Sequence, residues 1–81
     1  FNPETTISFD VDREAVVTLE VFDLNGQRIR TLAAGQRLAA GRYERVWDGC
    51  SESGARVASG VYLYRLSAPG FSALKKMTLL Q

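Results

Sequence analysis

Residues 15–22 read AVVTLEVF, and this stretch decides the fold class of the chain. Its apolar and polar side chains alternate, which is the pattern of a strand with one face in a core and the other in solvent. Asn25 and Gly26 follow closely, and both tolerate the positive φ that a tight hairpin turn requires. We therefore predict an antiparallel hairpin whose return strand covers residues 27–32, with Ile29 facing inward.

Alternating runs of the same kind recur along the rest of the chain, and turn residues separate them. The further predicted strands cover residues 6–11, 42–47, 60–66 and 71–80, with residues 56–58 as a short edge strand. Residues 33–41 are rich in small side chains and are interpreted as a connection. No segment repeats with the period of a helix. The spacing is typical of a sandwich, so we predict an all-β fold, an antiparallel β-sandwich of six to seven strands.

The chain has the size of one domain with one small core. A chain of 81 residues is just long enough for a single core to give independent stability. We therefore expect residues 1–81 to form a single domain in which two packed sheets bury a common set of inward side chains. The predicted core consists of Phe9, Leu19, Val21, Trp47, Tyr62, Tyr64 and Met77.

Composition argues against several classes of function. The formal net charge is +1, so neither nucleic acid nor an anionic membrane is an expected partner. No apolar run approaches the roughly 20 residues that span a bilayer. The chain contains no histidine, which removes the commonest general base, and its hydroxyl and thiol side chains lack a base partner in sequence. We therefore expect no enzyme activity, no cofactor and no small-molecule substrate.

Two acidic segments resemble parts of metal-binding sites. The segment from Asp23 to Gly26 lacks the later carboxylates of a calcium loop, so a hairpin turn is the better interpretation. Asp10 and Asp12 can share one side of a strand end, but a third ligand is missing. No metal site is therefore predicted. Cys50 is the single cysteine and cannot form a disulfide within the chain.

A compact motif at Trp47, Asp48 and Gly49 is predicted to be structural. Trp47 would fill the end of the core, and Asp48 would bond the backbone of its own turn. Gly49 would supply a backbone conformation that side chains disfavour. Gly60 would let the next strand start close to its neighbour, with Tyr62 facing inward from that strand.

The last residues of the given sequence form an apolar segment that follows two lysines, and we predict that this segment is a recognition tail. This predicted tail consists of Lys75, Lys76, Met77, Leu79, Leu80 and Gln81. An edge strand offers unpaired backbone groups and alternating side chains add specificity, so the tail fits recognition by β-augmentation. Lysines on an edge strand also discourage aggregation between sheets. On this hypothesis, removal of the tail stops the export of an attached reporter.

Four blocks of sequence, in order along the chain, resemble one family. They are FNPETTISF at 1–9, VFDLNG at 21–26, the block 41–62 with its WDG and SGVY segments, and KKMTLL at 75–80. Together they resemble the C-terminal sorting domain of the type IX secretion system, a family that overlaps with the immunoglobulin-like domain of the flagellar hook-capping protein. The central block is similar to both, whereas the first and last blocks favour the sorting domain. The resemblance implies an immunoglobulin-like sandwich.

This resemblance implies a non-catalytic sorting and attachment module of a larger secreted protein. The implied partners are the outer-membrane secretion translocon, a surface sortase-like protease and a covalently attached upstream cargo domain. The implied location is secreted or at the cell surface, reached through the periplasm. One alternative is the structural immunoglobulin-like domain of a flagellar hook-cap scaffold. Another is an accessory binding module, for example for carbohydrate, with Phe1, Tyr43 and Phe71 as candidate platform aromatics.

Overall fold

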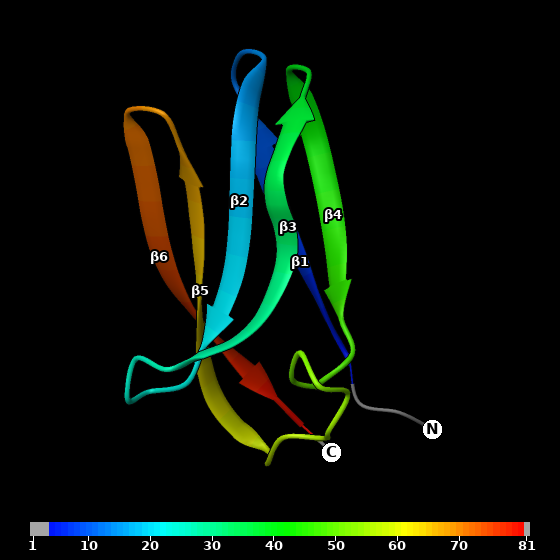
Figure 1. Ribbon diagram of the computed structural model, residues 1–81. Helices are drawn as coiled ribbons and strands as arrows, with labels where there is room; N and C mark the ends of the chain where they lie inside the picture. Colours follow the sequence, from blue (N-terminus) through cyan, green and yellow to red (C-terminus); the bar gives the residue numbers. More distant parts are fainter. Residues whose placement is uncertain (1–3, 81) are drawn as a thin grey trace.

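The computed structural model describes residues 4–80, and all of their regular structure is strand (Figure 1). Phe1 and Gln81, which the sequence singles out, lie outside the described residues. The strands are β1 (Thr5–Val11), β2 (Ala15–Phe22), β3 (Arg28–Leu38), β4 (Gly41–Trp47), β5 (Gly60–Ala68) and β6 (Phe71–Leu79). The described part of the chain contains no helix able to cross a membrane.

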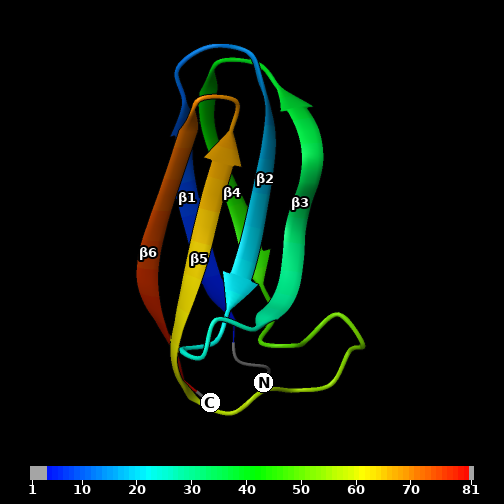
Figure 2. The same ribbon diagram turned by 60° about the vertical axis from the view of Figure 1, so that its left-hand side comes forward.

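The strands form two antiparallel sheets that pack face to face (Figures 1 and 2). One sheet has four strands in the order β3-β2-β5-β6, and the other contains only β1 and β4. The β1–β2, β3–β4 and β5–β6 turns gather at one end, with the β2–β3 hairpin and the 48–59 loop at the other. The predicted all-β antiparallel sandwich is confirmed, with six strands among the described residues.

The core between the sheets falls into two clusters. One contains Ile7, Phe9, Val17, Leu19, Ala33 and Leu38. The other contains Val21, Trp47, Tyr62 and Leu79. Most of the predicted core is confirmed, but Tyr64 and Met77 are half-buried and lie at its border. Both project from the β5–β6 half of the larger sheet, which the two-stranded sheet covers incompletely.

The prediction of a connection at residues 33–41 is wrong, because β3 continues through Leu38. Ala33 pairs with Leu19, and Leu38 pairs with Ala15 at the far end of β2. The register shifts along this pair, and at each shift β3 holds one more residue than β2. Gly35 adopts a φ of +59° within the strand, and its N–H donates to Thr18 Oγ1 at 3.1 Å. Small residues that resemble a loop in sequence therefore form β-bulges, which bend the strand.

The predicted edge strand at residues 56–58 is also wrong. Only a single antiparallel bridge, from Cys50 to Arg56, forms there. The N–H of Val57 donates to the carbonyl of Gly49 at 3.0 Å, so the segment returns across its own loop and adds no strand to a sheet.

Candidate functional site

The aromatic motif around Trp47 belongs to the core. The Trp47 side chain is fully buried, and its indole N–H donates to the carbonyl of Cys50 at 2.9 Å. The ring meets Tyr62 edge-on, with centroids 5.1 Å apart and an interplanar angle of 72°. The hydroxyl of Tyr62 donates to the carbonyl of Ala58 at 2.6 Å. Both polar atoms thus find partners inside the protein, and neither ring is presented to solvent.

Arg30 ties the loop after Trp47 to the larger sheet. Its guanidinium donates to Asp48 Oδ1 at 3.1 Å and to the carbonyl of Cys50 at 3.2 Å. Asp48 also accepts the Cys50 N–H at 3.0 Å, which is the predicted bond within its own turn. Glu52 accepts the Thr31 N–H at 2.7 Å. Sequence reasoning missed Arg30, because its partners lie about twenty residues away along the chain and follow a strand of the other sheet, so only the packing of the two sheets brings them together.

The remaining predicted motif residues occupy turns and strand starts. Gly49 and Gly26 have φ values of +76° and +86°, in the region that favours glycine. The Asp23 carboxylate accepts the N–H groups of Asn25 and Gln27, each at 2.9 Å, so this segment is the predicted hairpin turn. Gly60 is the first residue of β5, where it pairs with the last residue of β6.

Asp10 and Asp12 do not form a metal centre. Asp10 is paired with Arg42 on the neighbouring strand, with Nε to Oδ1 at 3.0 Å. Among residues 4–80 no group of three or more histidine, cysteine or acidic side chains is arranged to hold a metal ion.

A buried carboxylate on the outer face of the larger sheet was not predicted. Glu20 accepts from Arg65 at 2.9 Å and from Arg28 at 3.3 Å, and its side chain is only 11% exposed. The Arg65 guanidinium also covers the ring of Phe22, 4.8 Å from its centroid. The hydrogen bond from Arg65 is the main reason that the pKa of Glu20 lies below its ordinary value, although burial opposes the shift.

Because the pKa of Glu20 is lowered in the folded protein, the free energy of unfolding should depend on pH in the acidic range. The folded pKa of Glu20 is below the ordinary value of about 4.5, so the stabilisation is complete above that pH and lost as pH falls through the folded pKa. Glu20→Gln should lower the free energy of unfolding at pH 7 by about 1–2 kcal/mol. It should also flatten the pH dependence below about pH 4.5. Urea titrations across this range measure both effects. Glu44→Gln is the exposed control, and equal pH profiles for all three proteins would contradict the assignment.

The predicted recognition tail is divided between the surface and the core. Lys75 and Lys76 are exposed on β6, an edge strand, and Leu80 is 76% exposed. Met77 is half-buried and Leu79 is fully buried, because alternate residues of β6 face the other sheet. The expectation that Leu79 is available to a partner is therefore wrong.

The candidate aromatic platform is also not formed. Tyr43 stacks on Phe9 between the two strands of the smaller sheet, with centroids 5.7 Å apart, and its hydroxyl donates to the carbonyl of Ala39. Phe71 is 55% exposed, but it lies at the start of β6 in the other sheet. Tyr43 is therefore a packing residue, and the two rings do not share one flat surface.

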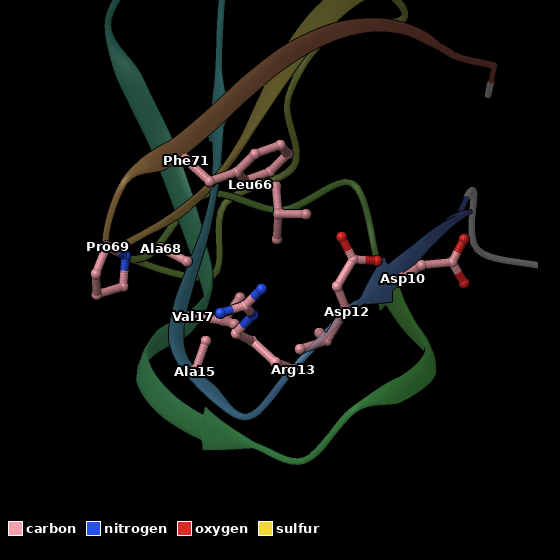
Figure 3. Close-up of a pocket in the computed structure, with 10 residues that line it drawn as sticks. Asp10, Asp12, Arg13, Ala15, Val17, Leu66, Ala68, Pro69 and Phe71 are labelled. Atoms are coloured by element: carbon pink, nitrogen blue, oxygen red, sulfur yellow. The ribbon is translucent and has the colours of Figure 1, made fainter.

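A groove runs between β1 and the inner side of β5 and β6. One part of it is a cavity of about 210 Å³, which Val11, Val17, Leu66, Ala68 and Phe71 line with apolar groups. Figure 3 shows Leu66, Ala68 and Phe71 from β5 and β6 on one side of this cavity and Asp12 and Arg13, which follow β1, on the other. A second hollow of about 190 Å³ shares Leu66 and Phe71 with the first and continues along β1.

Comparison with known proteins identifies relatives of this sandwich. The family model of the FlgD Ig-like domain matches residues 1–70. A crystal structure of FlgD from P. aeruginosa is similar with a TM-score of 0.68 and 25% sequence identity, over 95% of this chain and 60% of that chain. The present chain thus spans about 60% of the length of that structure. No curated protein matches the chain.

Proposed function

The chain belongs to the FlgD Ig-like domain family, and from this membership we propose that it is a structural domain of a flagellar hook-cap scaffold. The observation that carries the proposal is the family match over residues 1–70, which the similarity to FlgD supports. The same findings favour this alternative over the type IX sorting function, for which they provide no support. We also propose that residues 1–81 act as one domain outside the cell, as part of the hook.

The structure suits a scaffold that works through its surfaces. Within residues 4–80 every buried side-chain nitrogen and oxygen has a hydrogen-bond partner, as expected of a well-packed sandwich. The 48–59 loop is held by Arg30 and by the buried Trp47 ring. A domain held together in this way can position neighbouring proteins through its surfaces, which is the mechanism that we propose.

The hook-cap role can be tested in the organism that encodes the chain. Replacing residues 4–80 by a flexible linker should abolish hook assembly and motility, because the linker removes every surface that the scaffold presents. Electron microscopy of isolated basal bodies measures the result, and a copy that carries Leu80→Ala, an exposed position, should restore the hooks. Normal hooks in the linker strain would contradict the proposal.

The sorting function remains a separate proposal with a distinct test. A fluorescent protein directed to the periplasm of a type IX host and fused to residues 1–81 should stay in the periplasm if the domain is only a scaffold. Surface fluorescence that Lys75→Glu with Lys76→Glu removes would instead support sorting through the tail. Both lysines are exposed, so this double substitution changes the tail and keeps the fold.

A further inference from the structure

The β2–β3 hairpin contains an asparagine followed by a glycine, Asn25 and Gly26, and this pair can deamidate without an enzyme. In the reaction the backbone nitrogen of the glycine loses its proton and attacks the asparagine Cγ. The new N–C bond closes a five-membered imide ring, and the side-chain nitrogen leaves as ammonia. Water then opens the ring at one of its two carbonyls, which gives aspartate or isoaspartate. No atom is oxidised or reduced, and water is the only co-reactant.

Neither burial nor a neighbouring side chain shields this pair from solvent. Asn25 and Gly26 are both exposed. A Cβ added to Gly26 would meet no heavy atom within 4 Å among the described residues, its two chain neighbours aside. A glycine offers no side chain that would hinder attack by its own nitrogen. Any protection of Asn25 must therefore come from the hydrogen bonds and the backbone conformation of the turn.

The turn holds the proton on the nitrogen that would attack. The N–H of Gly26 donates to the carbonyl of Asp23 at 3.1 Å, and the N–H of Asp23 donates to the carbonyl of Gln27 at 3.0 Å. A donated hydrogen bond stabilises the protonated nitrogen, whereas the attack needs the nitrogen without its proton. The first bond also closes the turn and fixes the Asn25–Gly26 peptide plane, so the nitrogen cannot rotate toward Cγ.

The Asp23 carboxylate adds an electrostatic barrier. Its Oδ1 atom accepts the N–H groups of Asn25 and Gln27, each at 2.9 Å, so one oxygen contacts the chain on both sides of Gly26. Negative charge develops first on the glycine nitrogen and then on the oxygen of the tetrahedral intermediate. A carboxylate at this distance repels both charges and opposes the reaction. Asp23 therefore acts as a positioning residue for the closed turn and as a charge that disfavours attack.

The second dipeptide capable of imide formation is Asp48–Gly49, and it differs in two ways. Asp48 accepts from the Arg30 guanidinium at 3.1 Å and from the Cys50 N–H at 3.0 Å. These donors favour the ionised carboxylate, which resists attack by a nucleophile. Ring opening at this position would also return an aspartate or isoaspartate of unchanged mass, so it cannot be mistaken for deamidation.

We propose that Asn25 is a latent modification site, which the closed turn protects and which deamidates when the β2–β3 hairpin opens. Both products place a new carboxylate beside that of Asp23. The isoaspartate product also moves one side-chain carbon into the main chain, so the Gly26 N–H no longer meets the Asp23 carbonyl and the original turn cannot re-form. Local opening of the hairpin would thus leave a permanent chemical record. The inference concerns the hairpin alone and does not depend on the flagellar role.

The test follows deamidation of the 81-residue chain in mildly alkaline buffer, with and without concentrated guanidinium chloride. Cleavage after Arg13 and Arg28 releases the peptide 14–28, and fragment masses distinguish a change at Asn25 from one at Gln27. The rate in the folded protein should be slower than in the denatured protein by about tenfold or more, because only the open fraction reacts. Equal rates in the two states would overturn the proposal.

Substitutions at Asp23 test its protective role. Asp23→Ala should raise the rate in the folded protein by about tenfold, because it removes the charge and two hydrogen bonds, and should leave the denatured rate nearly unchanged. Asp23→Asn keeps an acceptor oxygen without the charge, so its rate should lie between these two. Asp12→Ala, an exposed aspartate in the β1–β2 turn, is the control and should react like the wild type.

Circular dichroism of each variant checks that the sandwich is intact, so that a faster reaction reports the turn itself. An Asp23→Ala protein that deamidates no faster than the Asp12→Ala control would overturn the protective role. A slower reaction in Asp23→Ala would also overturn it, because it would show that the carboxylate accepts the glycine proton and promotes the attack.

Discussion

Trp47→Ala is expected to unfold the domain or leave it barely folded. The indole is fully buried between the sheets, contacts Tyr62 edge-on and donates to the Cys50 carbonyl. Truncating a buried tryptophan costs about 3–5 kcal/mol, because the cavity cannot close fully. A domain of this length has roughly 4–12 kcal/mol of total stability, so the loss consumes much or all of it. The substitution also removes the hydrogen bond from the indole N–H to the Cys50 carbonyl, which holds the 48–59 loop.

Urea unfolding followed by far-ultraviolet circular dichroism measures this effect, since Trp47 is the only fluorescent indole. Val46→Ala is the matched control: Val46 is 52% exposed, and its loss should change stability by no more than about 0.5 kcal/mol. Trp47→Phe keeps a ring in the core and removes the indole N–H, so its stability should lie between the wild type and the alanine variant. A Trp47→Ala protein as stable as the Val46→Ala control would contradict the structural role.

Leu79→Ala should destabilise the domain by about 2–5 kcal/mol. Leu79 is the last residue of β6, yet it is fully buried in the same cluster as Val21, Trp47 and Tyr62. It pairs with Gly60 and so joins the ends of β5 and β6. The expected result is therefore a core defect at a position that sequence alone would place in a loose tail.

The adjacent leucine supplies the control for this experiment. Leu80 is 76% exposed, and Leu80→Ala should lie within about 0.5 kcal/mol of the wild type in the same urea titration. Equal effects of the two substitutions would contradict the burial of Leu79. The difference also bears on the sorting hypothesis, because deletion of residues 75–81 would remove half of β6 together with Leu79. A failure of export after such a deletion would report unfolding as readily as a lost signal.

Several elements could be predicted from the sequence because their signals are local. Alternation defined β2 at its observed bounds and β1, β4, β5 and β6 to within about two residues at each end. Turn residues located the hairpin at Asn25 and Gly26, where the φ of Gly26 is +86°. The same alternation identified Phe9, Leu19, Val21, Trp47 and Tyr62 as core.

The errors arose where local and tertiary preferences differ. Ala33, Ala34 and Gly35 have no alternating pattern, but pairing with β2 holds them in a bulged strand. Glu20 has the position of a solvent-facing residue, and only the Arg65 and Arg28 side chains on neighbouring strands bury it. The tail was interpreted as accessible because its apolar residues lie near the end of the sequence, whereas β5 pairs with residues 75–79 and Leu79 faces the core.

The sequence by itself determined the class of fold, the turns and most of the core, because a period of two and a positive φ are properties of neighbouring residues. Only the tertiary structure decided which carboxylate is buried and where a groove opens. Those features depend on which strands lie side by side, and the paired residues of β1 and β4 are 30 or more positions apart in the chain. Long-range pairing of four strands against two thus created the uncovered surface beside β1.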